Sequence, residues 1–161
     1  MPSGLHRASL RVFGWLPPKV RRVAVRFITP SFTVGAMCAI ERADGQILLA
    51  RQVYRQRWGL PGGLLNRGEG GAEAARREIV EEVGLSVELV GEPATVVDAQ
   101  ARRVDLVFRA RLADPGDADD ARPTSPEISD VGWFDRSALP ELQHESIQAL
   151  AALARVTSPG E

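Results

Sequence analysis

The stretch from Gly63 to Leu85, which reads GLLNRGEGGAEAARREIVEEVGL, constrains the fold of this chain more than any other segment. Apolar side chains recur in its second half at the spacing of one helical face, and this period predicts an amphipathic α-helix. The expected buried stripe consists of Ala72, Ala75, Ile79 and Val83. Gly84 predicts the end of the helix, because a glycine just past the last turn readily takes the left-handed C-cap conformation.

Three glutamates give this expected helix an acidic face. Glu78, Glu81 and Glu82 stand at i, i+3 and i+4, so they share one side of the helix, away from the buried stripe. Like charges this close repel each other, and a bound cation is the usual compensation. Three carboxylates with room for water suit a hard divalent ion, Mg²⁺ before others. The same pattern also fits a solvated acidic surface, so the helix alone leaves both interpretations open.

The spacing of the whole segment is more specific than its acidic face. Gly63 is followed after five residues by Glu69, and after seven more by Arg77-Glu78, an apolar residue, Glu81-Glu82, Gly84 and Leu85. This arrangement resembles the signature box of the Nudix hydrolases, G-x5-E-x7-R-E-U-x-E-E-x-G-U with U an apolar residue, and every specified position matches. The runs 58–63 and 131–135, with Leu139-Pro140, are also similar to Nudix proteins, so the resemblance covers roughly residues 32–155.

The resemblance implies an α/β fold, the Nudix α/β/α sandwich around a mixed β-sheet. The remaining patterns agree with it, because strands flanked by two helices suggest a mixed sheet between helical layers. Alternation from Phe32 to Ile40, the turn Ala43-Asp44-Gly45 and the run 47–51 predict a hairpin. Further strands are expected at 87–90, 95–98, 103–112 and 128–134, a mobile loop at 114–126 and a helix at about 146–155.

The resemblance also implies roles for the residues of the box. Glu81 and Glu82 are the expected metal ligands, with Glu78 as a third ligand or as the group that orients water, and the backbone of Gly63 supplies a carbonyl. The expected ion is Mg²⁺, with Mn²⁺ as the second choice. The general base comes either from the box, where Glu78 and Glu82 are candidates, or from a distal loop. Glu127 is the distal candidate, and an ordinary polar loop residue is the alternative for it.

Other residues of this region have structural roles. Gly62 and Gly63 are expected to form a tight loop with backbone conformations closed to other residues. The resemblance implies that Arg77 pairs with Glu69, against the alternative of an ordinary surface ion pair of little energetic worth.

The expected reaction follows from a divalent ion that bridges a diphosphate, polarises a phosphorus centre and lowers the pKa of an attacking water. The bond broken is then the phosphoanhydride of a nucleoside diphosphate linked to another group, such as a nucleotide sugar or an ADP-ribose-like compound. Hydrolysis of modified nucleoside triphosphates and non-catalytic nucleotide binding are the alternatives. The run 99–103 contains neither the proline nor the tyrosine that marks certain Nudix sub-families, so the sequence does not name its substrate.

A basic cluster just before the box is the candidate binding site for this small-molecule substrate. It comprises Arg51, Tyr54, Arg55 and Arg57. An arginine suits phosphate because its fork donates two hydrogen bonds. A solvated basic loop is the alternative interpretation. Trp58 is expected to pack beneath this loop rather than to line a base pocket.

The first residues of the chain differ from the rest in charge. Residues 1–30 are interpreted as a basic arm or helix, 31–156 as the Nudix domain and 157–161 as a flexible tail. The arm contains arginines and no acidic residue. Three interpretations compete: a helix that packs on the domain or on a second subunit of a homodimer, a surface for anionic substrate or lipid headgroups, and a cleaved targeting segment.

Composition limits the partners and the compartment. The net charge of −1 indicates no general attraction to duplex nucleic acid or anionic lipid. No apolar run is long enough for a transmembrane segment. Cys38 is the single cysteine, which excludes an internal disulfide and indicates a reducing compartment, so a cytoplasmic location is expected. Its thiol lies in an apolar strand pattern and is expected to be buried and inert.

Overall fold

The structure, a computed structural model, describes residues 31–156 together with Trp15, Pro17, Pro18 and Val20. The chain divides into two compact units, Met1–Phe32 and Thr33–Glu161. The arm expected over residues 1–30 and the tail expected over 157–161 therefore lie outside the described residues, apart from those four positions. No helix in the described part of the chain is both long and apolar enough to cross a bilayer.

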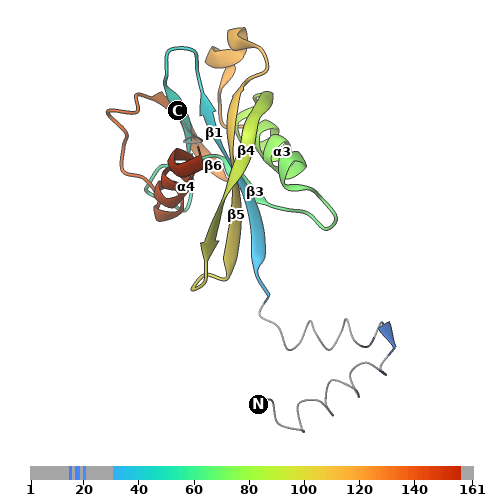
Figure 1. Ribbon diagram of the computed structural model, residues 1–161. Helices are drawn as coiled ribbons and strands as arrows, with labels where there is room; N and C mark the ends of the chain where they lie inside the picture. The colour runs from blue at the N-terminus through green and yellow to red at the C-terminus, as the bar shows by residue number, and fades with distance from the viewer. Residues whose placement is uncertain (1–14, 16, 19, 21–30, 157–161) are drawn as a thin grey trace. The chain divides into compact units, whose positions relative to one another are not determined.

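A mixed β-sheet forms the centre of the second unit (Figure 1). Its strands follow the order β4-β5-β1-β2-β6, with β3 paired to β1. The strands β1 and β5 run parallel, whereas the other pairs are antiparallel. The strands are β1 Thr33–Glu41, β2 Ile47–Gln52, β3 Gly62–Leu64, β4 Val87–Asp98, β5 Arg103–Leu112 and β6 Ile128–Phe134.

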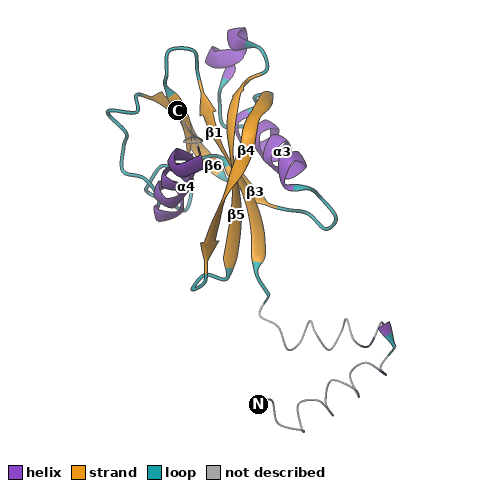
Figure 2. Ribbon diagram, viewed as in Figure 1, coloured by secondary structure: helices purple, strands orange, loops and turns teal. Residues whose placement is uncertain are grey.

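Two helices cover the opposite faces of this sheet (Figure 2). The helix α3, Gly71–Val83, buries Ile79 and Val83 in one apolar cluster. The helix α4, His144–Val156, buries Ala149 and Leu153 in a second cluster on the other face. The layers are therefore helix, sheet and helix, which confirms the predicted sandwich. The helix α3 ends at Gly84 with φ of 73° in the left-handed region, as predicted.

The central strand β1 is buried on both faces. Ala36, Cys38 and Ile40 contribute to the cluster under α3, whereas Met37 and Ala39 contribute to the cluster under α4. The alternating set that predicts this strand therefore marks only one of its two buried faces. A strand covered by helices on both sides reads as a continuous apolar run instead of a simple alternation.

The segment predicted as a tight glycine loop is partly a strand. Gly62–Leu64 forms β3 and pairs with β1, with Ala36 opposite Gly63. Gly62 has a φ of 149°, a backbone conformation that residues with a side chain rarely adopt. A Cβ at this position would stand 2.7 Å from Met37 Cα and closer still to the Ala36 carbonyl oxygen. The two strands can pair this closely only because Gly62 has no side chain.

Two further expectations need correction. The two strands expected at 87–90 and 95–98 are one strand, β4, which is interrupted by a register shift between Val90 and Ala94. The loop expected at 114–126 contains a 3₁₀ helix, Pro115–Asp120. The Asp114 side chain caps this helix by accepting a hydrogen bond from Gly116 N, and Trp133 Nε1 donates to the Ala118 carbonyl. The glycine and proline residues of this segment predict a loop, but they do not predict the hydrogen bonds of Asp114 and Trp133.

A buried hydroxyl at the start of α4 fixes the segment that leads into β3. Ser146 is fully buried, and its Oγ accepts a hydrogen bond from Leu60 N at 2.9 Å. We expect Ser146→Ala to lower the free energy of unfolding by about 1–3 kcal/mol, because the Leu60 N–H is left buried without a partner. Urea unfolding measures this change. Ser86→Ala is the control, at an exposed serine whose hydroxyl makes no hydrogen bond among the described residues, and it should change stability by less than about 0.5 kcal/mol.

Candidate functional site

One cleft of about 480 Å³ gathers charged side chains from widely separated parts of the chain. Carboxylates line it from α3, from the loop before β6 and from the start of α4: Glu78, Glu81, Glu82, Glu127 and Glu145. Arg55 and Arg103 are the arginines that line the same cleft. Carboxylates therefore exceed guanidinium groups by three in formal charge, so the side chains of the cleft by themselves repel a phosphate chain.

Glu82 is the most enclosed of these carboxylates. Its side chain is buried, and its Oε2 accepts a hydrogen bond from Gly62 N at 2.8 Å. Burial raises the pKa of Glu82 to about 7, the Gly62 hydrogen bond lowers it, and the neighbouring charges of Glu78, Glu127 and Glu81 raise it further. The sequence places Glu82 on a face away from the buried stripe, whereas the structure places it where α3 meets β3.

Arg77 holds the outer carboxylates of α3. Its Nε and Nη2 donate to both oxygens of Glu69 at 2.7 and 2.9 Å, which is the pairing that the family resemblance implies. Its Nη1 donates to Glu78 at 2.7 Å and to Glu81 at 3.1 Å. The pKa of Glu69 falls to about 2, first because of these Arg77 hydrogen bonds and then because of the Asn66 N–H. Arg77 therefore links the loop after β3 to the acidic face of the helix.

The acidic set does not yet have the arrangement of a metal site. No three His, Cys, Asp or Glu side chains within the described residues converge closely enough to hold a metal ion. The hydrogen bonds explain this, because Arg77 holds Glu78 and Glu81 while Gly62 holds Glu82. The donor set is nonetheless composed of carboxylate oxygens that line one cleft, which is the ligand chemistry that a hard divalent ion prefers. The residues therefore fit such an ion once Arg77 releases its carboxylates.

The glycines of β3 shape the floor of the site. A Cβ on Gly63 would stand 2.6 Å from Glu78 Oε2, so the absence of a side chain lets Glu78 approach the strand. Cys38 N donates to Pro61 O, and Leu65 N donates to Val34 O. In an antiparallel pair, the backbone groups of successive residues point alternately toward and away from the partner strand. The Gly63 carbonyl therefore faces β1, whereas the N–H and the carbonyl of Gly62 face α3. Gly62 thus presents the backbone carbonyl on the side of the acidic helix, where the sequence assigns this role to Gly63.

Glu127 also lines the cleft. It lies in the loop before β6, and its backbone carbonyl accepts from Val53 N at 2.9 Å. Its charge is close enough to Glu82 to raise the pKa of that residue. Among the described residues its carboxylate has no hydrogen-bonding or ion-pairing partner. The fold therefore brings the distal candidate base to the same cleft as the α3 carboxylates.

The basic cluster predicted to bind substrate divides into two pairs. Tyr54 and Arg55 line the cleft. Arg51 lies outside its lining: it forms an ion pair with Asp130 and stacks over the Trp58 ring, with its guanidinium carbon 5.3 Å from the ring centroid. Arg57 also lies outside the lining and pairs with Glu141 at 2.7 Å.

The ring of Trp58 is partly buried and packs against the core cluster under α4. Trp58 packs edge-on against Phe134 with ring centroids 4.8 Å apart, and it does not line the cleft.

Sequence patterns do not reveal several residues of the cleft. Arg103 stands at the start of β5, and the parallel pairing of β5 with β1 brings it beside the site. Gln143 and Glu145, at the start of α4, line the cleft because this helix packs against the sheet. Gln52 lines the cleft with a side-chain oxygen that is buried without a hydrogen-bond partner among the described residues.

Known proteins resemble this chain in sequence and in fold. The NUDIX domain pattern matches residues 31–153. The chain is similar to a MutT-like protein of Streptomyces ambofaciens, with 29% identity over 126 residues that cover 77% of this chain and 79% of that protein. It is also similar to the 8-oxo-dGDP phosphatase of Mus musculus, with 32% identity over 93 residues, covering 56% of this chain and 28% of the mouse protein. The chain thus matches less than a third of that relative's length.

A solved structure gives the same result. The chain superposes on an ADP-ribose pyrophosphatase from Streptococcus suis with a TM-score of 0.65 and 26% sequence identity. The match covers 82% of this chain and 96% of the other. The sandwich described above is therefore an arrangement that this chain shares with phosphoanhydride hydrolases.

Proposed function

The chain belongs to the Nudix hydrolase family, and from that premise we propose that it is a Mg²⁺-dependent pyrophosphohydrolase. Its substrate in this proposal is a nucleoside diphosphate that is linked through its outer phosphate to a second group. The observation that supports it most is the excess of carboxylates in the cleft. A diphosphate is repelled by that charge unless cations enter with it.

Four of the five carboxylates that line the cleft have a task in this proposal. Glu81 and Glu82 hold the ion together with Glu78, and the Gly62 carbonyl faces them from β3. A bound Mg²⁺ supplies charge neutralisation and Lewis acidity toward the phosphorus, and Mn²⁺ can supply the same chemistry. Glu127 accepts the proton of the attacking water, since its carboxylate is not held by any arginine among the described residues. Arg55 donates to the phosphate oxygens with its free nitrogen.

A substrate panel tests this function. Nucleotide sugars, ADP-ribose, unmodified nucleoside triphosphates and 8-oxo-dGTP are incubated with MgCl₂ and with EDTA, and the products are identified by mass spectrometry. We expect hydrolysis of a diphosphate-linked compound in MgCl₂ to give two monophosphates, and no hydrolysis in EDTA. Equal turnover with and without EDTA would contradict the role of the carboxylates.

The panel includes oxidised nucleotides because of a specific similarity. The mouse relative acts on 8-oxo-dGDP and is 32% identical over the matched segment. Preferential release of phosphate or pyrophosphate from oxidised nucleotides would favour this second function over the first.

We also propose that the enzyme works in the cytoplasm. Cys38 is free and buried in β1, and burial raises the pKa of its thiol to about 12. A thiol this weakly acidic does not react readily, and a single unpaired cysteine is typical of a reducing compartment.

A further inference from the structure

The last turn of α3 is held by a loop that lies far from it in the sequence. The last four carbonyl groups of an α-helix have no partner within the helix, and in α3 these groups belong to residues 80–83. Gly84 N donates to the first of them, as is usual at a left-handed cap. The other three accept hydrogen bonds from the segment 122–124, which precedes β6. This segment therefore caps the turn of α3 that carries Glu81 and Glu82.

Thr124 supplies two donors to this turn. Its backbone N–H donates to Glu82 O at 3.1 Å, and its hydroxyl donates to Glu81 O at 2.9 Å. The hydroxyl also lies 3.3 Å from Val80 O, which is a second acceptor for the same proton. The methyl group of Thr124 lies beside Gly84, where an added Cβ would stand 3.0 Å from Thr124 Cγ2. The backbone, the hydroxyl and the methyl group of one residue thus all meet the end of α3.

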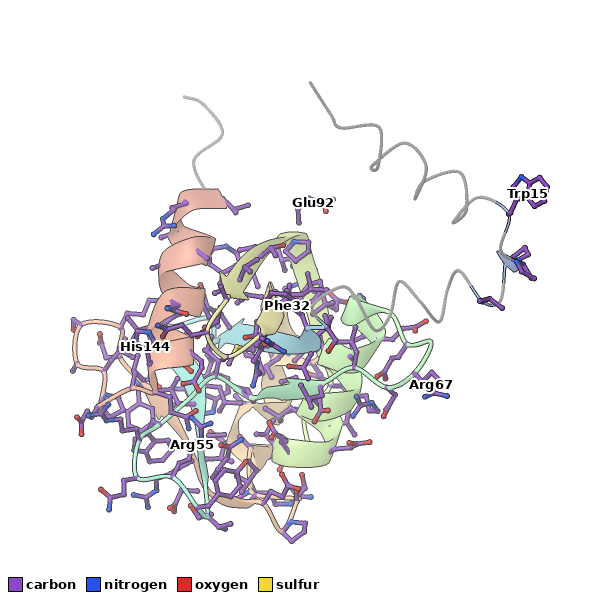
Figure 3. All side chains as sticks on the ribbon, turned by 90° about the horizontal axis from the view of Figure 1, so that it is seen from below. Trp15, Phe32, Arg55, Arg67, Glu92 and His144 are labelled. Carbon is purple, nitrogen blue, oxygen red and sulfur yellow. The ribbon has the colours of Figure 1, made fainter. Side chains whose placement is uncertain are left out.

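The loop that contains Thr124 also carries the candidate base. Glu127 follows Thr124 by three residues and lines the cleft, whereas Thr124 lies outside the lining. Figure 3 shows the side chains of the domain and labels Arg55, which lines the same cleft. Glu127 N donates to Ser125 Oγ at 3.2 Å, and Ile128 N donates to Ser125 O at 3.1 Å, so this part of the loop is a compact turn. A movement of Thr124 away from α3 is therefore passed on to Glu127.

Glu127 is anchored to the sheet by separate contacts. Val53 N donates to Glu127 O at 2.9 Å, and Ile128 pairs with Gln52 at the end of β2. These contacts fix the position of Glu127 relative to β2, but they do not involve α3. The position of Glu127 relative to the acidic helix therefore depends on the hydrogen bonds of the segment 122–124.

Electrostatic repulsion acts against the docking of this loop. Glu127 and the carboxylates of α3 line one cleft, and groups of like charge that share a site repel each other. The carbonyl end of a helix also carries a partial negative charge, which disfavours a nearby carboxylate. The donors of the segment 122–124 offset both effects, because they satisfy the carbonyls at the end of α3.

We propose that Thr124 is a positioning residue that holds Glu127 in place relative to the carboxylates of α3. Thr124 does not contact the substrate and acts through Glu127, which accepts the proton of the attacking water. This inference rests on the proposed function for the task of Glu127. The docking of the loop on α3 is a property of the fold and can be tested without turnover.

Two substitutions of Thr124 separate the role of its hydroxyl from that of its methyl group. Thr124→Val removes the hydroxyl and keeps the branched shape of the side chain, whereas Thr124→Ser keeps the hydroxyl. Thr95→Val is the matched control, because Thr95 is exposed on β4 and its hydroxyl makes no hydrogen bond within the part of the chain that the structure describes. Thermal unfolding verifies that all three variants are folded.

Steady-state kinetics in MgCl₂ uses the compound of the substrate panel that the wild type hydrolyses fastest. We expect Thr124→Val to lower kcat by about threefold to tenfold, the ratio that corresponds to the loss of one hydrogen bond. KM and the half-saturating MgCl₂ concentration should change by less than about twofold, because the carboxylates that hold the ion are unchanged. Thr124→Ser and Thr95→Val should keep kcat within about twofold of the wild type.

A double-mutant cycle identifies the group through which Thr124 acts. Glu127→Gln removes the proposed base, so Thr124→Val should cause no further loss of kcat when it is added to this variant. An equal loss of kcat with and without Glu127→Gln, or no loss in either case, would overturn the inference. A half-saturating MgCl₂ concentration that rises by more than about threefold would also overturn it, because Thr124 would then act on the metal ligands.

Hydrogen–deuterium exchange in EDTA tests the docking of the loop without catalysis. Peptides that cover residues 124–130 should exchange faster in Thr124→Val than in the wild type, Thr124→Ser or Thr95→Val. Unchanged exchange in Thr124→Val would refute the inference whatever happens to kcat. If the wild type hydrolyses no compound of the panel, the proposed function fails by itself. Faster exchange confined to this loop would then still support the role of Thr124 in holding Glu127 in place.

Discussion

Glu82→Gln should lower Mg²⁺-dependent turnover by more than about a hundredfold. Removal of a group that only supports a metal ligand already lowers activity by up to about a hundredfold, and this substitution changes the proposed ligand itself. The amide keeps the shape of the side chain and can still accept the hydrogen bond from Gly62 N, so the fold is retained. What is lost is the negative charge that holds the ion. Steady-state kinetics with varied MgCl₂ measures this effect. Wild-type turnover in the variant would remove Glu82 from the proposed metal site.

The same variant has a distinct effect on stability. Burial raises the pKa of Glu82 from its ordinary value of 4.5 to about 7 in the folded protein. When the pKa of a glutamate is higher in the folded than in the unfolded protein, the residue does not lower the free energy of unfolding at a pH below the unfolded pKa, because it is protonated in both states. Between the two pKa values the free energy of unfolding falls as the pH rises, and above the folded pKa the loss is constant. In EDTA, Glu82→Gln should therefore match the wild type at pH 4 and exceed its stability at pH 8.

Urea unfolding at these two pH values measures the difference. Glu73→Gln is the control, since Glu73 lies on the same helix, is exposed and does not line the cleft. It should change neither turnover nor the dependence of stability on pH by a comparable amount. A stability gap between Glu82→Gln and the wild type that shrinks as the pH rises would contradict the burial of a charge at this position.

Gly62→Ala should damage both the fold and the activity. The added methyl group would overlap the backbone of Ala36 and Met37, which cannot move without separating β3 from β1. The φ of 149° adds strain for any residue that carries a Cβ, and such conformations cost about 1–3 kcal/mol. We expect at least this loss in the free energy of unfolding, together with loss of the hydrogen bond from Gly62 N to Glu82.

Gly63→Ala is the matched comparison for this substitution. Its added Cβ would meet only the carboxylate of Glu78, the far end of a flexible side chain. That carboxylate can turn away, so the variant should unfold at nearly the wild-type urea concentration while turnover falls. If both alanine variants lose the same stability, the close approach of β3 to β1 is not the reason for the glycine at position 62.

The sequence predicts the acidic helix well because all its signals are local. The apolar period, the three glutamates and the Gly84 cap lie within one segment, and α3 spans Gly71–Val83 with Gly84 in the left-handed region. The strand at 103–112 is predicted with its observed bounds for the same reason, since its alternation is uninterrupted.

Non-local pairing explains what the sequence does not show. The strand β3 depends on a backbone approach that only the fold reveals, and Gly62-Gly63 in isolation suggests a turn. Arg51 and Arg57 lie near the box in sequence, yet Asp130 and Glu141 hold them away from the cleft lining. Arg103 lies far from the box in sequence and reaches the cleft because β5 pairs with β1.

The contacts of Arg77 have a consequence for how the enzyme becomes active. Its guanidinium group pairs with Glu78 and Glu81 as well as Glu69, so its single positive charge offsets part of the repulsion on this face of the helix. If the proposed metal site is correct, binding of the ion would be an exchange of partners within a formed domain and would not require the domain to fold around it. Under the proposed function, a change in magnesium concentration would then alter catalysis while the amount of folded enzyme stays constant.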